Sequence, residues 1–228
     1  MKKAILISIG LFFLNSTVQA QAVRSNVLNP DHAGKIFRNP INKKNKPVGS
    51  PYLQQAFHGA TVEDLNIKAF MRYSVFNDEF EFISQKNDTL ILDKIEDFGK
   101  ITFITTNKKY RLIAYTNSKN SLTNGYLIEL YSKSSYTLYK KENISFTEEK
   151  VAKTTLEVGM PAKYTKIDDT YFLRMPNGNT TEFPDGKKAL SKLFPDKKQA
   201  IETFVKTNKI DFDNVADLVK VIDFLATL

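Results

Sequence analysis

The sequence predicts an α+β fold, in which an antiparallel β-sheet roll or sandwich is followed by a C-terminal cap of two to three short helices. Two observations carry this prediction. Through residues 67–175, apolar and polar residues alternate in short segments that recur about every 8–12 residues, as in antiparallel sheets. After Asn177-Gly178-Asn179 the apolar spacing becomes helical, and the chain shows no strand–helix–strand spacing of the kind that builds a parallel sheet.

The longest alternating segment covers residues 67–83 and predicts a β-hairpin. From Ile67 to Val75 every second residue is apolar, which places an apolar row on one face. Asn77-Asp78-Glu79 offers a turn, and Phe80 and Phe82 resume the alternation after it. One face of this hairpin is therefore expected to lie on the core.

Shorter segments with the same period are expected to continue the sheet. A second hairpin is predicted from residues 125–132 and 136–141, and Asp168-Asp169 suits a two-residue turn between the last two strands. The full set of expected segments is 89–93, 101–106, 110–116, 125–132, 136–141, 144–146, 154–158, 163–167 and 170–175.

Three short amphipathic helices are expected after residue 185. The first covers residues 185–194 and ends at Pro195. Asp196 is expected to cap the second, which closes at Asn208. Asn214 with Asp217 would cap the third, residues 215–225. Helices this short are not stable alone in water, so they must pack on one another and on the sheet.

The first twenty residues have the pattern of a cleaved secretory signal peptide. Lys2 and Lys3 precede an apolar run from Ala4 to Leu14, which is too short to cross a bilayer core of about 30 Å. Val18-Gln19-Ala20 fits a cleavage site. The protein is therefore expected to be exported, periplasmic or secreted after cleavage near Ala20. Residues 21–50 are expected to form a basic flexible arm, and residues 51–228 a single domain whose helical part begins near residue 185.

The formal net charge of +8 is unevenly distributed. Residues 21–50 hold six basic residues against Asp31 alone, a net +5, whereas residues 51–228 sum to only +1. A nucleic-acid-binding domain carries its own basic face, so this class of function is disfavoured. The basic arm would suit contact with an anionic surface. The chain has no cysteine, which excludes disulfides, thiolate metal sites and a cysteine nucleophile.

Most catalytic and cofactor motifs are missing from the sequence. The two histidines, His32 and His58, are far apart, and His58 beside Gly59 is interpreted as a turn residue. There is no G-x-S-x-G, no S-x-x-K and no glycine-rich phosphate loop. Residues 211–214, D-F-D-N, lack the glycine and the distal glutamate of a calcium loop, and helix capping explains them better. Neither a metal nor another cofactor is therefore expected.

Carboxylates offer the one route to catalysis. Hydrolysis of a glycan needs two acids about 5–10 Å apart across a cleft. The available clusters are Asp78, Glu79 and Glu81 near the first turn, and Asp168 with Asp169. The favoured interpretation assigns the first cluster to a turn, with Glu81 on the solvent face of a strand, and the second to a hairpin tip.

Tyrosines are dense between residues 110 and 139. If Tyr115, Tyr131 and Tyr139 face outward, they would form an aromatic surface that binds sugar rings or a protein partner. If they face inward, they fill the core, and the phase that Tyr126 shares with Ile128 and Leu130 favours core for that row. The full set is Tyr110, Tyr115, Tyr126, Tyr131, Tyr136 and Tyr139.

Several segments carry a family resemblance. They are G-S-P-Y-L (49–53), M-R-Y-S-V-F-N-D-E-F-E-F (71–82), N-G-Y-L-I-E-L-Y (124–131) and the tail 187–210. Together they resemble an uncharacterised family of exported Bacteroidota proteins, over about residues 49–228. The resemblance implies a periplasmic or secreted location in a Gram-negative cell and brings no activity with it. In that setting Asp88-Thr89-Leu90 resembles an O-glycosylation signal at Thr89.

Two functions are consistent with these observations. The first is an exported, non-enzymatic binding module of the bacterial envelope whose partner is an envelope protein or a polysaccharide. The alternative is a carboxylate-dependent hydrolase that acts on glycan or peptide. The scarcity of catalytic motifs favours the first.

Overall fold

The computed structural model describes residues 37–38, 47–63, 65, 67–95, 99–150 and 159–228. The predicted signal peptide, most of the basic arm, His32 and the expected strand 154–158 lie outside the described residues. Within them, no helix has both the length and the apolar character needed to cross a membrane.

The predicted α+β class is confirmed. One large mixed sheet is followed by three α-helices in the described C-terminal part, α1 (Lys187–Leu193), α2 (Lys198–Thr207) and α3 (Val215–Leu225), with a 3-10 turn, η2 (Pro195–Lys197), between the first two. The strands are β1 (Phe37–Arg38), β2 (His58–Val62), β3 (Ile67–Ser74), β4 (Glu79–Ile83), β5 (Thr89–Leu92), β6 (Ile101–Phe103), β7 (Lys109–Thr116), β8 (Leu122–Lys133), β9 (Tyr136–Thr147), β10 (Lys163–Arg174) and β11 (Thr180–Glu182).

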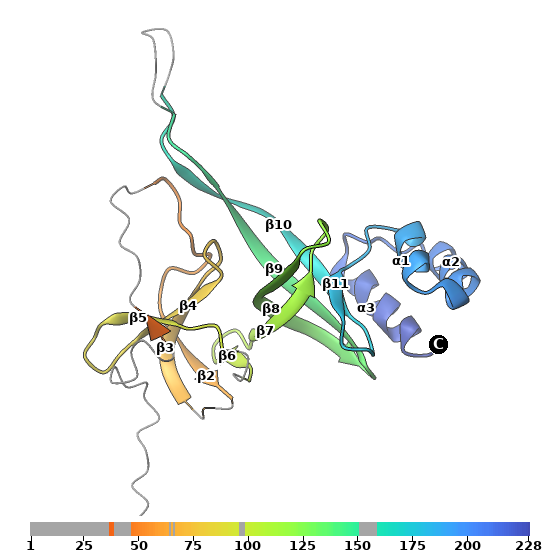
Figure 1. Cartoon of the computed structure of the whole chain (residues 1–228), viewed down its shortest axis with the longest axis horizontal. Helices are drawn as coiled ribbons and strands as arrows, with labels where there is room; N and C mark the ends of the chain where they lie inside the picture. The colour runs from red at the N-terminus through yellow and green to blue at the C-terminus, as the bar shows by residue number, and fades with distance from the viewer. Residues whose placement is uncertain (1–36, 39–46, 64, 66, 96–98, 151–158) are drawn as a thin grey trace, which may run out of the picture.

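Strand β7 joins two parts of the sheet. The pairing order is β1-β5-β4-β3-β2-β6-β7-β11-β10-β9-β8, and β7 also pairs with β8. Strands β7 to β11 therefore form a closed circuit of pairings, to which β1–β6 are attached as an open antiparallel sheet. The β7–β11 pairing is parallel and joins Thr116 to Thr181. In Figure 1, β1–β6 lie at one end of the molecule, the helices lie at the other, and the long β9–β10 hairpin runs between them.

The two predicted hairpins are confirmed as β3–β4 and β8–β9. Met71, Tyr73, Phe80 and Phe82 of the first are all buried, as the alternation predicts. Both strands of the second hairpin are longer than predicted. The expected strand 144–146 is the far end of β9.

Strand β8 is buried on both faces along part of its length. Tyr126 and Ile128 belong to the core under β1–β6, whereas Leu127 belongs to a second core with Tyr115 and Tyr139. A β-bulge between Glu129 and Tyr131 then shifts the alternation. As a result Leu130 is 36% exposed. The prediction that it lies in the core row with Tyr126 and Ile128 is therefore wrong.

Two other local predictions are corrected, and one strand was not predicted. Asp168 and Asp169 are not a hairpin tip, because β10 runs continuously through them with a register shift between Ile167 and Thr170. His58 is not in a turn but begins β2, opposite Met71 on β3. Strand β11 follows the turn at residues 176–178 and was not predicted, since three residues of sequence Thr-Thr-Glu carry no usable alternation.

The helical cap matches the prediction closely. Asn214 caps α3, because its side chain accepts a hydrogen bond of 2.9 Å from the backbone N–H of Ala216. Asp196 does not cap α2, because it lies inside the 3-10 turn that Pro195 begins. The helices cover β8–β10 with a core that includes Leu138 and Leu173 of the sheet together with Leu190, Ile201, Val205, Leu218, Val221, Ile222 and Leu225 of the helices.

The chain enters the sheet through residues 47–57, which we call the entry segment. Val48 forms a parallel bridge with Lys163, exchanging hydrogen bonds of 2.8 and 2.9 Å with the backbone of Ala162 and Tyr164. The next residue, Gly49, has φ of 82°. A Cβ atom on Gly49 would lie 2.5 Å from the backbone oxygen of Tyr164, so the glycine allows the entry segment to approach β10.

We expect the variant Gly49→Ala to be destabilised by about 2–3 kcal/mol, because the left-handed conformation and the backbone clash both oppose a Cβ. Gly178→Ala is the first control: its φ is 84° but a Cβ there would meet no atom within 4 Å, so a loss of about 1 kcal/mol is expected. Gly186→Ala, on extended backbone in open space, should lose only the preference for glycine over alanine at the N-cap of α1, about 0.5 kcal/mol. Urea denaturation of the three variants checks this order, and equal midpoints for Gly49→Ala and Gly178→Ala would contradict it.

Candidate functional site

The outer face of the β3–β4 hairpin carries a buried ion pair. Glu81 is only 4% exposed and accepts hydrogen bonds from Arg72 at 2.6 and 2.9 Å. The Tyr52 hydroxyl donates a third at 2.6 Å. The guanidinium of Arg72 lies 4.1 Å from the ring centre of Tyr52 and 4.5 Å from that of Phe57. The prediction that Glu81 faces solvent is therefore wrong, because the entry segment covers this face of the strand.

Asp78 holds the tip of the same hairpin against β8 and β9. Its backbone φ is 55°, a conformation that aspartate adopts in turns. One carboxylate oxygen accepts hydrogen bonds from the Tyr73 hydroxyl at 2.5 Å and from the backbone N–H of Tyr126 at 3.1 Å. The other oxygen lies 2.7 Å from the Lys94 ammonium and 3.3 Å from that of Lys141.

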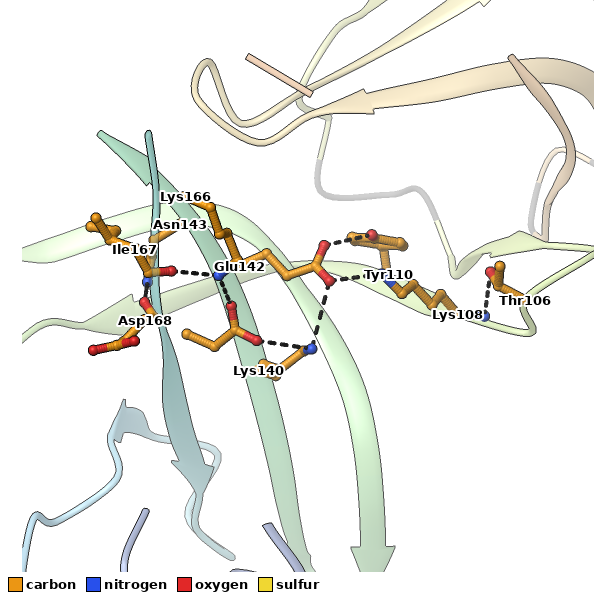
Figure 2. Close-up of polar contacts among 10 residues, drawn as sticks. Thr106, Lys108, Tyr110, Lys140, Glu142, Asn143, Lys166, Ile167 and Asp168 are labelled. Carbon is orange, nitrogen blue, oxygen red and sulfur yellow. Dashed lines mark hydrogen bonds and ion pairs between the residues drawn. The ribbon is translucent and has the colours of Figure 1, made fainter. Parts of the chain in front are cut away.

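A second buried carboxylate, Glu142, lies on β9 at the centre of an ionic network (Figure 2). Its side chain is 6% exposed. It accepts hydrogen bonds from Lys108 at 2.7 Å and from the Tyr110 hydroxyl at 3.4 Å, and the Lys140 ammonium lies 3.6 Å away. Lys140 also contacts Asp169 at 3.1 Å, so one lysine links the two carboxylates.

Asp169 is held by two lysines. Besides the contact with Lys140, it accepts a short hydrogen bond from Lys166. Burial disfavours the charged form of Asp169, but the hydrogen bonds from Lys166 and Lys140 outweigh it and lower the pKa of the carboxyl. Asp169 is therefore ionised at neutral pH. Its neighbour Asp168 is exposed and contributes a backbone oxygen that accepts from the Asn143 amide at 2.8 Å.

A cavity of about 20 Å³ lies beside Glu142. This volume corresponds to about one water molecule. Burial, followed by the charge of Glu142, raises the pKa of Tyr110 in its wall above the usual value of 10.0. The walls are formed by Leu53, Gln54, Ala56, His58, Arg72, Tyr73, Val75, Phe103, Lys108, Tyr110 and Glu142. An imidazole and a carboxylate thus line one cavity, but there is no room between them for a substrate.

The tyrosines proposed as an aromatic surface do not form one. Tyr115 is 5% exposed and Tyr139 is 1% exposed, because β7, β8 and β9 enclose a core of their own. Tyr131 is half-buried and its hydroxyl donates a hydrogen bond of 2.6 Å to Asp223 of α3. The three side chains therefore stabilise the interior and the helical cap.

A much larger hollow lies on the helical cap. An open groove of about 630 Å³ runs along α2 and is bounded on one side by α3. Its aromatic floor is formed by Phe204 and Phe224, whose rings stack in parallel, 3° from coplanar, with 4.1 Å between centres. The lining residues are Asp196, Lys197, Gln199, Ala200, Thr203, Phe204, Thr207, Asn208 and Phe224. The volume lies in the range of ligand sites. The lining combines three apolar side chains, Ala200, Phe204 and Phe224, with six polar or charged ones.

Comparison with protein-family models, with curated proteins and with solved structures gave no match for this chain. In the described part of the chain, no group of three or more His, Asp or Glu side chains is arranged to hold a metal ion. The groove and the buried carboxylates are therefore the features on which a function can be based.

Sequence reasoning missed Glu142 and the groove. Glu142 follows Lys140 and Lys141 in a polar run, and nothing local distinguishes it from a solvent-exposed strand residue. The groove had a usable signal: Ala200, Thr203, Phe204 and Thr207 repeat at helical spacing, on a face of α2 adjacent to the one that Ile201 and Val205 bury.

We expect Arg72→Leu to lose about 3 kcal/mol of stability, because it leaves the buried Glu81 carboxylate without its cation. Adding Glu81→Gln to that variant should restore part of the loss, since the amide removes the charge and still accepts from Tyr52. Thermal or urea unfolding of the two variants checks this. A double variant no more stable than Arg72→Leu would contradict the role of the buried charge.

The lowered pKa of Asp169 predicts a pH dependence. A carboxyl with a depressed folded-state pKa contributes stability above the unfolded pKa, and this contribution disappears as the pH falls through the folded value. We therefore expect the native protein to lose stability more steeply below about pH 4 than the variant Asp169→Asn, which should already be less stable at pH 7. Urea midpoints measured from neutral to acidic pH check this. Parallel curves for the two proteins would contradict it.

Proposed function

We propose that this protein is an exported, non-enzymatic binding module of the bacterial envelope, which holds another envelope macromolecule in the groove of its helical cap. The proposal rests on the different volumes of two hollows in the structure. The groove has about 630 Å³ open to solvent, whereas the cavity lined by His58 and Glu142 has about 20 Å³. The groove has room for a partner but contains neither His58 nor Glu142, and the cavity that contains both has no room for one.

Three of the five carboxylates named for the hydrolase alternative contact cations. Asp78 contacts Lys94 and Lys141, Glu81 contacts Arg72, and Asp169 contacts Lys140. General acid catalysis needs a carboxyl that is protonated at the working pH. The lowered pKa of Asp169 instead favours the deprotonated form of this carboxyl. These pairs favour a structural role for the acids.

Export is supported by the sequence of residues 1–20, with its two lysines and apolar run, and by the resemblance to exported Bacteroidota proteins. On this basis we place the protein in the periplasm or outside the cell. For the sheet, we infer a roll in preference to a sandwich. The closed circuit of pairings from β7 to β11 supports this choice.

The proposal is tested with a substitution that places a large side chain in the groove and leaves the buried core unchanged. Ala200 is exposed in the groove wall, so Ala200→Trp should block a partner while the fold stays intact. Ala216→Trp is the matched control, since Ala216 is exposed on the first turn of α3 and does not line the groove. We expect wild-type protein and Ala216→Trp to retain the same component of an envelope extract, and Ala200→Trp to retain at least about tenfold less.

Retention that is unchanged by Ala200→Trp would refute the groove as the binding site. The hydrolase alternative is tested in parallel, by incubating purified protein with peptidoglycan and with a denatured protein substrate. Soluble products that disappear in a folded Glu142→Gln variant would replace the binding proposal with an enzymatic one.

A further inference from the structure

The sequence contains two Asn-Gly dipeptides, Asn124-Gly125 and Asn177-Gly178. Asn-Gly is prone to spontaneous deamidation, because glycine has no Cβ to keep its backbone nitrogen away from the preceding side-chain amide. The two dipeptides are chemically alike, but the fold places them in different surroundings. Asn177-Gly178 lies in the turn between β10 and β11, whereas Asn124-Gly125 lies within β8.

The turn leaves its dipeptide accessible. Asn177 and Gly178 are both exposed, and a Cβ on Gly178 would meet no atom within 4 Å, so no neighbouring group restricts this peptide unit. The Gly178 N–H donates a hydrogen bond of 2.9 Å to the Met175 carbonyl. A hydrogen bond in an exposed turn opens at a lower free-energy cost than one inside a sheet, so the nitrogen of Gly178 is available for reaction.

The side chain of Asn177 is held in a way that favours the reaction. Its amide oxygen Oδ1 accepts a hydrogen bond of 3.0 Å from the backbone N–H of Asn179. When the Gly178 nitrogen attacks the side-chain amide carbon, negative charge develops on this same oxygen. A donor already directed at the oxygen stabilises that charge, as in an oxyanion hole. The turn therefore supplies the nucleophile, the electrophile and a hydrogen-bond donor from consecutive residues.

The dipeptide in β8 lacks this freedom. Gly125 is buried and pairs with Ile113 of β7, and Asn124 pairs with Ala114. A Cβ on Gly125 would lie 2.6 Å from the Asp78 carboxylate, so this peptide unit is also closely packed. To cyclise, Asn124 must leave the extended conformation and break the pairing of β7 with β8, which requires local unfolding.

We propose that Asn177 is a site of spontaneous deamidation whose product loosens the attachment of β11. The backbone nitrogen of Gly178 loses its proton to solvent base and attacks Cγ of Asn177, and ammonia leaves as the succinimide ring closes. Water then opens the ring at either of its carbonyl groups, which gives aspartate or isoaspartate. The reaction uses water alone and needs neither an oxidant nor a cofactor.

The isoaspartate product lengthens the main chain of the turn by one carbon atom, because the chain then runs through the side chain of residue 177. The turn is closed by the Met175 N–H, which donates to the Asn179 carbonyl at 2.9 Å. It leads directly into β11, whose Thr181 pairs with Thr116 of β7. A longer turn displaces β11 from its register with β10, so the modification is expected to weaken the circuit of strands at this pairing.

The experiment incubates the full-length mature protein in mildly alkaline buffer and maps its tryptic peptides by mass spectrometry with fragment spectra. Residues 120–133 and 175–187 form two tryptic peptides, each of which contains one of the dipeptides. In the native protein we expect deamidation at Asn177 to be at least about tenfold faster than at Asn124, since only the second site must unfold first. In concentrated urea the rates at the two sites should be about equal.

Two variants act as controls. Gly178→Ala places a methyl group beside the attacking nitrogen and should slow deamidation at Asn177 by at least about tenfold. Asn177→Gln should leave the turn unmodified, because the longer side chain would have to form a larger and less favourable ring. Hydrogen exchange is the second measurement: wild-type protein after incubation should exchange the amides of β11 at least about threefold faster than fresh protein, and Asn177→Gln protein treated alike should not change.

The absence of deamidation at Asn177 in the native protein, or equal native rates at Asn124 and Asn177, would overturn the proposed site. Deamidation at Asn177 that leaves hydrogen exchange in β11 unchanged would refute the proposed effect on the strand circuit.

Discussion

The arrangement of the molecule depends on the carboxylate of Asp78. It lies at the tip of the β3–β4 hairpin, which packs on one core, and accepts from the backbone of Tyr126 on β8, which also borders the second core. Gly125 makes this contact possible, since a Cβ there would lie 2.6 Å from the Asp78 carboxylate. Two lysines from different parts of the chain contact the other carboxylate oxygen, Lys94 after β5 and Lys141 on β9. One acidic side chain therefore fixes the open part of the sheet against the closed part.

Three segments that lie far apart in sequence contribute to the surroundings of this hairpin. Residues 49–53 supply the Gly49 approach to β10 and the Tyr52 bond to Glu81. Residues 71–82 supply Arg72, Asp78 and Glu81, and residues 124–131 supply the strand that Asp78 reaches. All three meet around a single hairpin. The pattern is that of a structural scaffold.

The sequence correctly predicted those hairpins and helices that depend on residues close together in the chain. The β3–β4 and β8–β9 hairpins follow from alternation and turn residues, and α3 follows from its apolar spacing and the Asn214 cap. The errors lie where a distant segment changes the environment. Glu81 is buried because the entry segment covers it, and Tyr115 and Tyr139 are buried because β7–β9 have a core on each side. The alternation of apolar and polar residues within one strand does not show whether a distant segment covers its other face.

Contacts with distant segments also limited what the sequence could predict about the candidate site. Paired acids were a reasonable catalytic hypothesis, but their cation partners include residues distant in sequence, as Lys140 of β9 is for Asp169 of β10. The groove, by contrast, is formed by α2 and one residue of α3, and most of its lining residues repeat at helical spacing along α2.

The closed circuit of strands has a consequence for how the chain reaches its folded state. The pairing of β7 with β11 joins Thr116 to Thr181, and the chain between these two residues contains β8, β9 and β10. Contacts between residues so distant in sequence form slowly, because the entropy of a long loop must be lost first. Until β11 arrives, the end of β7 presents unsatisfied backbone groups that another chain could pair with. In the folded protein β11 covers the end of β7 and so removes this edge from pairing with another chain.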